Sequence, residues 1–203
     1  MEDFGVKIDQ KELEKCADYL ETHKWGQVQN DTSDKETGFI YYINSYDLLK
    51  HLCDINECDF DYAINRFYNF WCSTTCEQML CELGATKESN KKDHDKDIFI
   101  KGVPFDVKLT LLSSKAPKCD LTSREGKDKL IEWLIQNASQ EGRKQNCNRL
   151  FIVCVASGYG KMQRLKYNQE KIAKSLLNFM RYYYDKELHK IGDIFADLII
   201  VRE

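Results

Sequence analysis

The chain has 203 residues, of which 42% are hydrophobic and 12% aromatic, which supports a packed core and excludes a disordered chain. No apolar run approaches the ~20 residues that cross a bilayer, and the acidic start MEDFGVKIDQ has no apolar signal segment. We therefore expect a soluble, cytoplasmic protein without a membrane partner. The net charge is −3, but residues 1–100 carry 11 Lys and Arg against 21 Asp and Glu, whereas residues 101–203 carry 19 against 12. The basic second half is a first hint of an anionic ligand.

The first 57 residues predict a helical extension. Four apolar positions follow the spacing of a helix face: Leu13, Cys16, Ala17 and Leu20. The stretch FIYYIN at 39–44 predicts a short strand, and Ser45 is placed to cap a helix that follows. We predict a boundary after this segment, with an N-terminal helical extension at 1–57 and an α/β core at 58–203.

Helical and strand patterns alternate in the core segment. A helix is predicted at 58–84, two strands around Gly102, a helix at about 124–141, a doubly buried strand at 149–157 with a turn after it, a helix at 168–190 and a last strand at 195–201. Asp59 or Asp61 can cap the first of these helices, and Gly84 can end it. This order predicts an α/β fold with a mixed sheet flanked by helices.

Nine cysteines invite a disulfide or metal reading. Their number is odd, and no CxxC pair exists. Cys72, Cys76 and Cys81 form the closest set, and a metal or iron–sulfur site there would lack the usual ligand spacing. Buried reduced thiols are the favoured interpretation.

The stretch DIFIKGVPFDVKLT, residues 97–110, places charges within an apolar hairpin. Asp106 and Lys108 are two residues apart, so their side chains project from one face of the strand. An antiparallel turn near Gly102 would set Asp97 opposite Asp106. Two close carboxylates repel unless a cation lies between them, and Mg²⁺ accepts such ligands together with water and phosphate oxygens. The hairpin therefore predicts a magnesium site in which Lys108 assists the chemistry.

These residues resemble the signature of the PD-(D/E)XK nuclease superfamily, whose fold is that of restriction endonucleases. In that family a carboxylate opens one strand, and Asp/Glu-x-Lys follows on the next. The resemblance covers roughly residues 58–156, and the helix–strand–strand–helix–strand order is similar. It implies hydrolysis of phosphodiester bonds, with Asp97 and Asp106 as ligands of Mg²⁺ or Mn²⁺ and Lys108 as the catalytic lysine. Lys96 stands where the family's proline would precede the first acid, and Asp106 replaces the commoner Glu.

Many members of that family add a glutamate from the preceding helix. Glu77 and Glu82 are the candidates here, and Glu77 is favoured. Asp95, two residues upstream, could also take the place of Asp97. The glutamate and the first acid are thus the two positions of the predicted site for which two residues are candidates.

The leading prediction is a metal-dependent nuclease acting on nucleic acid, DNA ahead of RNA, of a restriction or other defence type. A homodimer would supply two sites for the two strands of a duplex. The first alternative is a catalytically inactive nuclease-fold protein that binds nucleic acid or serves in assembly. In the second, Asp106 and Lys108 are a surface pair on the hairpin of a protein-binding protein with no polyanion ligand.

Overall fold

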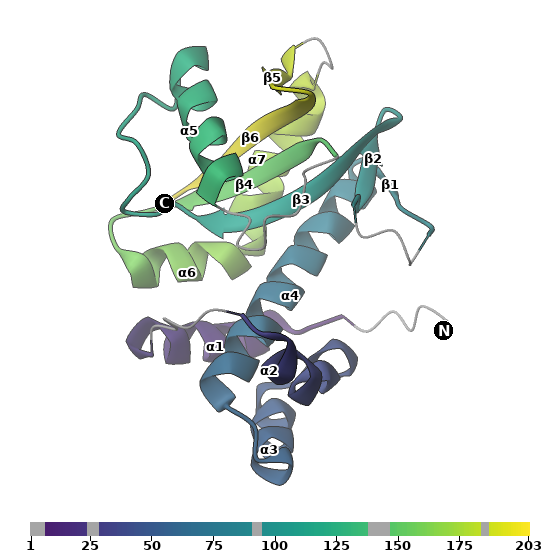
Figure 1. Cartoon of the computed structure of the whole chain (residues 1–203), viewed down its shortest axis with the longest axis vertical. Helices are drawn as coiled ribbons and strands as arrows, with labels where there is room; N and C mark the ends of the chain where they lie inside the picture. Colours follow the sequence, from purple (N-terminus) through teal and green to yellow (C-terminus); the bar gives the residue numbers. More distant parts are fainter. Residues whose placement is uncertain (1–6, 24–28, 91–94, 138–146, 184–186) are drawn as a thin grey trace.

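A computed structural model describes residues 7–23, 29–90, 95–137, 147–183 and 187–203 of the chain. It shows an α/β fold in which a six-stranded mixed sheet is flanked by helices, with further helices from the N-terminal part (Figure 1). None of the described helices combines the length and apolarity needed to span a membrane.

The sheet has the strand order β1-β2-β3-β4-β6-β5. Its strands are β1 (Thr86–Lys87), β2 (Ile98–Ile100), β3 (Val103–Leu111), β4 (Arg149–Val155), β5 (His189–Ile191) and β6 (Ile194–Arg202). The pairs β1–β2, β2–β3 and β5–β6 are antiparallel, whereas β3, β4 and β6 run parallel to one another. The mixed sheet predicted from the alternating pattern is confirmed.

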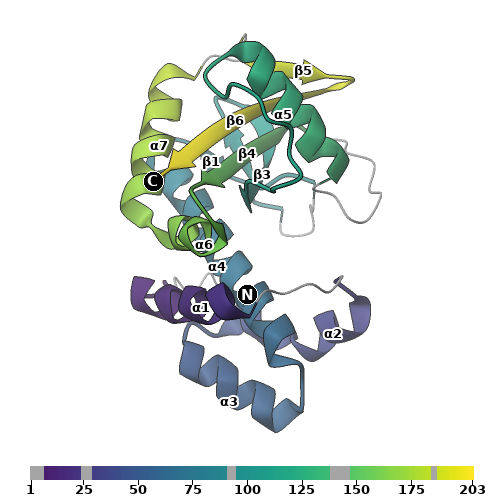
Figure 2. The same cartoon turned by 90° about the vertical axis from the view of Figure 1, so that its left-hand side faces the viewer.

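Helices cover the two faces of the sheet unequally (Figure 2). One face packs against α4 (Phe60–Glu82), α6 (Tyr159–Tyr167) and α7 (Gln169–Tyr182), and the other against α5 (Arg124–Asn137). β4 is buried on both faces: Ile152 belongs to the larger apolar cluster and Phe151 to the smaller one beneath α5. This two-sided burial explains the continuous apolar run that the sequence shows there.

The N-terminal helices are α1 (Gln10–Thr22), α2 (Asp31–Glu36) and α3 (Tyr46–Asn56). Leu13, Cys16, Ala17 and Leu20 of α1 are buried, as the helical spacing predicts. α1 packs on α4 and α6, so its apolar face joins the same core cluster as the sheet. The long helix α4 links these helices to the sheet (Figure 1).

Local capping residues set the helix ends in this part of the chain. Ser45 accepts a hydrogen bond from the N–H of Leu48 at the start of α3, and Asp59 accepts one from Tyr62 at the start of α4. Gly84, just past α4, has φ +106°, a conformation that glycine adopts without strain. The predicted caps are therefore confirmed.

Three local predictions differ from the structure. Residues 39–42, predicted as a strand, lie in the 3₁₀ helix Gly38–Tyr42, where the ring of Tyr41 packs edge-on against Phe70 of α4. The turn predicted after β4 is shorter, because α6 begins at Tyr159. The helix predicted to run to residue 190 ends at Tyr182, and His189 lies in β5. Residues 138–141, the predicted end of α5, are outside the described part of the chain.

Candidate active site at the β2–β3 hairpin

The hairpin has the register that the sequence predicts. Ile98 lies opposite Phe105 and Ile100 opposite Val103, so Asp97 lies one residue beyond the last pair, next to Asp106. Lys101 and Gly102 turn the chain, both with positive φ. Because the apolar residues of β3 face the larger core cluster, Asp106 and Lys108 project from the other face.

The Asp97 carboxylate reaches across the hairpin to β3. Its Oδ2 accepts a hydrogen bond of 2.8 Å from the N–H of Val107, the residue between Asp106 and Lys108. Its own N–H donates to the carbonyl of Phe105 at 2.8 Å. The first acid is thus fixed beside the second, as the resemblance implies.

Asp106 is buried and contacts two cationic side chains. Lys108 Nζ lies 3.2 Å from its Oδ1, and the Arg149 guanidinium binds its Oδ2. Half of the Lys108 side chain is exposed, compared with 10% of Asp106. Lys108 can therefore reach a ligand from the surface while its amine stays next to the acid.

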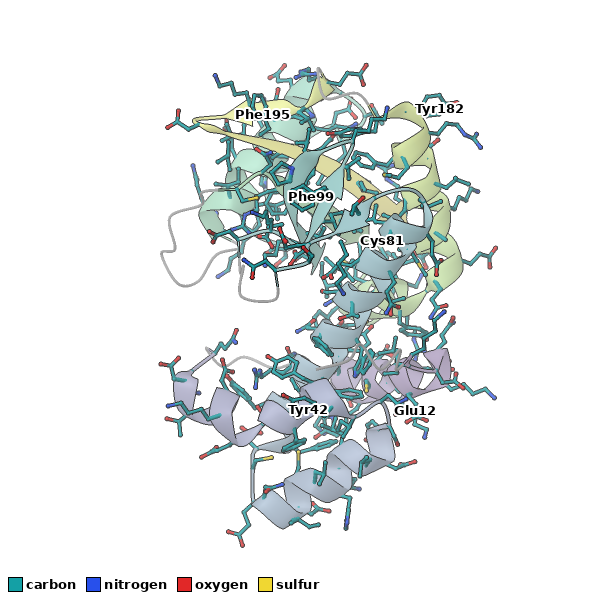
Figure 3. All side chains as sticks on the ribbon, turned by 90° about the vertical axis from the view of Figure 1, so that its right-hand side faces the viewer. Glu12, Tyr42, Cys81, Phe99, Tyr182 and Phe195 are labelled. Atoms are coloured by element: carbon teal, nitrogen blue, oxygen red, sulfur yellow. The ribbon has the colours of Figure 1, made fainter. Side chains whose placement is uncertain are left out.

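Glu77 of α4 is the third acid of this region. Burial, and then the charge of Asp97, raise its pKa to about 7, whereas Lys87 and Lys108 lower it. The effect of Asp97 on Glu77 puts the predicted glutamate within electrostatic range of the first acid. Figure 3 shows the end of α4, at Cys81, beside the strands that include Phe99 of β2.

Arg149 is the residue that sequence analysis missed. It begins β4, and the parallel register sets it directly beside Asp106 of β3. Burial lowers its pKa, while Asp97 and Asp95 raise it, so it also faces the two acids before β2. Its position at the start of an apolar run is visible in the sequence, but the register that pairs β3 with β4 joins residues 43 apart and leaves no local signal.

We call Glu77, Asp97, Asp106, Lys108 and Arg149 the hairpin site. Its carboxylate oxygens are the ligands that Mg²⁺ prefers, and the charge of Asp97 that raises the pKa of Glu77 is a repulsion that a cation would relieve. Within the described residues, no three His, Cys, Asp or Glu side chains already form a metal-binding group. A divalent ion would share Asp106 with Lys108 and Arg149. The Nε of Arg149 is buried and has no hydrogen-bond partner among the described residues.

The three cysteines considered for a metal do not form one group. Cys72 and Cys76 are buried in the core, while Cys81 is only partly buried. Burial raises the pKa of Cys72 to about 12, which favours the protonated thiol over the thiolate that binds metals. The structure therefore agrees with the interpretation of buried thiols.

No protein-family model, no curated protein and no solved structure matches the chain. The hairpin site and the rest of the molecular surface are therefore the basis for a functional assignment.

Proposed function

We propose that the protein is a metal-dependent phosphodiester hydrolase whose active site is the hairpin site. The observation that carries the proposal is the position of Asp97, hydrogen-bonded to β3 between Asp106 and the half-exposed Lys108, with Glu77 of α4 in electrostatic range of Asp97. Mg²⁺ is usually bound through one or two carboxylates together with water and phosphate oxygens, which Asp97 and Asp106 can supply.

Asp97 and Asp106 would hold Mg²⁺ or Mn²⁺, with Glu77 as the third acid. The ion would polarise a phosphoryl oxygen and lower the pKa of water. The half-exposed Lys108 binds the phosphate that is attacked and stabilises the charge developing on it. Arg149 holds the Asp106 carboxylate in its orientation.

DNA is the preferred substrate in this proposal, and RNA the competitor. The support is the net positive charge of residues 101–203, which suits a polyanion. A restriction or defence role, and a homodimer that cuts both strands, are the cellular form that we propose for this activity. The resemblance of the hairpin to PD-(D/E)XK nucleases supports the same reaction.

A cleavage assay tests the proposal. Wild type, Asp106→Asn and Lys108→Ala are incubated with plasmid DNA, linear DNA and RNA in Mg²⁺, in Mn²⁺ and in EDTA. We expect cleavage by wild type only with metal, and a loss of at least about 100-fold in both variants. Lys190→Ala, an exposed lysine of β5, is the matched control and should cleave like wild type. Thermal unfolding verifies that each variant is folded.

Two results would overturn the assignment. One is no cleavage of any substrate by folded wild type in either metal. The other is equal cleavage by Asp106→Asn, which would point to a contaminating nuclease.

The second candidate function is a catalytically inactive relative that binds nucleic acid or serves in assembly. The observation that favours it is the ion pair between Asp106 and Arg149, which neutralises the central carboxylate with a partly buried side chain. It predicts salt-sensitive DNA binding that survives Lys108→Ala, together with no cleavage in any metal. Gel-shift titrations at two salt concentrations, run beside the cleavage assay, separate the two candidates.

A further inference from the structure

A groove of about 840 Å³ lies along β6, toward the end of the strand order that is opposite the β2–β3 hairpin. α7 forms one wall, and the segment 121–127 that leads into α5 forms the other. The floor is β6 from Asp197 onward. Figure 2 shows β6 (yellow) with α7 and α5 on its two sides.

The floor of the groove is an open strand edge. β5 pairs with β6 only from Ile194 to Ala196, and in the described part of the chain no other strand pairs with that edge beyond it. Ile191 and Ile194 close a two-residue hairpin turn, so Ile194 and Ala196 direct their backbone polar groups toward β5. By the alternation of a strand, Leu198, Ile200 and Arg202 direct theirs into the groove.

One of these backbone groups is already occupied. The N–H of Leu198 donates to the carboxylate of Asp197 at 2.7 Å. The N–H groups of Ile200 and Arg202 and the carbonyls of Leu198 and Ile200 remain on the open edge. They form the ladder that an added strand would use. The six residues from Asp197 to Arg202 span ~20 Å, which accommodates a short extended peptide.

The walls of the groove are basic. Four of its cations form no ion pair with the described residues: Lys127, Lys171, Lys174 and Arg202. The groove also has three acids: Glu203 is paired with Lys161, Asp197 is bound to the backbone, and Glu187 is exposed. Phe179 of α7 adds apolar surface to the lining. The groove thus combines a hydrogen-bonding edge, apolar contact and an excess of positive charge.

We propose that the groove along β6 binds an extended, acidic peptide segment of a partner protein by adding it to the sheet as a further strand. The open ladder distinguishes this occupant from a nucleic acid, which has no alternating N–H and C=O groups to pair with a strand edge. Lys171 and Lys174 of α7, which form no ion pair with the described residues, select acidic side chains on the added strand. This surface is distinct from the hairpin site.

Fluorescence anisotropy with a labelled peptide tests the proposal. The probe has about ten residues and alternates Glu with Val, so that each residue type shares one strand edge and one face. Two further probes carry N-methyl groups on all Glu amides or on all Val amides. Because only one edge of the peptide can pair with β6, we expect one methylated probe to lose at least about tenfold in affinity and the other to keep most of it.

Charge reversal supplies the second arm. Lys171→Glu combined with Lys174→Glu should weaken binding of the unmodified probe by at least about tenfold. Lys190→Glu, an exposed lysine of β5 outside the groove, should leave it unchanged. Binding should also weaken as salt rises.

Three outcomes would overturn the proposal. The first is no binding of the unmodified probe. The second is equal binding of both methylated probes, because attraction would then be electrostatic without strand pairing. The third is displacement of the probe by a single-stranded oligonucleotide of about 12 nucleotides that binds more tightly and shows the same sensitivity to the α7 variants, which would assign the groove to nucleic acid.

Discussion

The hairpin site and the β6 groove contain similar residues but use them differently. At the hairpin site each central charge has a partner: Asp106 contacts Lys108 and Arg149, and Asp97 accepts a backbone N–H. Along β6, lysines of α7 line a groove without an ion pair among the described residues. Paired, buried charges maintain a geometry, whereas unpaired charges beside an open strand edge are ready for a partner.

The largest effect on stability is expected when the ion pair between Asp106 and Arg149 is broken. Arg149→Ala leaves the buried Asp106 with Lys108 alone, and removing the partner of a buried charge destabilises by about 3 kcal/mol. The matched change in the groove, Arg202→Ala, removes an exposed side chain and should cost less than about 0.5 kcal/mol. Urea unfolding of both variants measures the difference. Similar losses would show that Asp106 is not held mainly by Arg149.

A smaller, pH-dependent effect is expected at Glu77. Its pKa is about 7 in the folded protein and near 4.5 when unperturbed, so the folded state retains the proton that the unfolded state releases between those values. Stability therefore falls as pH rises from about 4.5 to 7, and the full cost is present above 7. Glu77→Gln removes this cost and should stabilise the protein by on the order of 2 kcal/mol at pH 8, and much less at pH 4.5.

Thermal and urea unfolding in EDTA at both pH values test this prediction. Glu132→Gln, an exposed acid of α5, is the control and should show no such pH dependence. A gain for Glu77→Gln that is equal at both pH values would contradict the raised pKa and remove the electrostatic link between Glu77 and Asp97.

The smallest effect is expected in the groove. Lys171→Gln with Lys174→Gln should change the free energy of unfolding by less than about 0.5 kcal/mol, because neither amine has an ion-pair partner in the described structure. Urea unfolding at low and high salt provides the measurement. A clear loss of stability would mean that these lysines hold α7 in place, and the contrast between the two regions would then fail.

The sequence predicts the hairpin well because its signals are local. The turn at Gly102 fixes the register from Ile98 to Phe105, and alternation places Asp106 and Lys108 on one face. Helix caps such as Ser45 and Asp59 are likewise predicted from local sequence, because each bonds to the N–H of a residue three positions later. The expectation that Glu77 lies near Asp97 depends on one helix preceding the hairpin, and the charge of Asp97 does raise the pKa of Glu77.

Non-local pairing is what the sequence does not reveal. Arg149 meets Asp106 only because β4 lies parallel to β3, and the open edge of β6 exists only because β5 is short. The segment 39–42 has strand-forming residues, yet packing of Tyr41 on α4 places it in a 3₁₀ helix. In each case tertiary contacts outweigh local preference.

The most direct test of the central claim is a count of bound Mn²⁺ by electron paramagnetic resonance. Wild type should bind Mn²⁺, and Asp97→Asn and Asp106→Asn should each weaken binding by at least about tenfold. Asp193→Asn, an exposed acid in the turn between β5 and β6, should bind like wild type. Equal binding by all four proteins, or none by wild type, would contradict a divalent ion at the hairpin site.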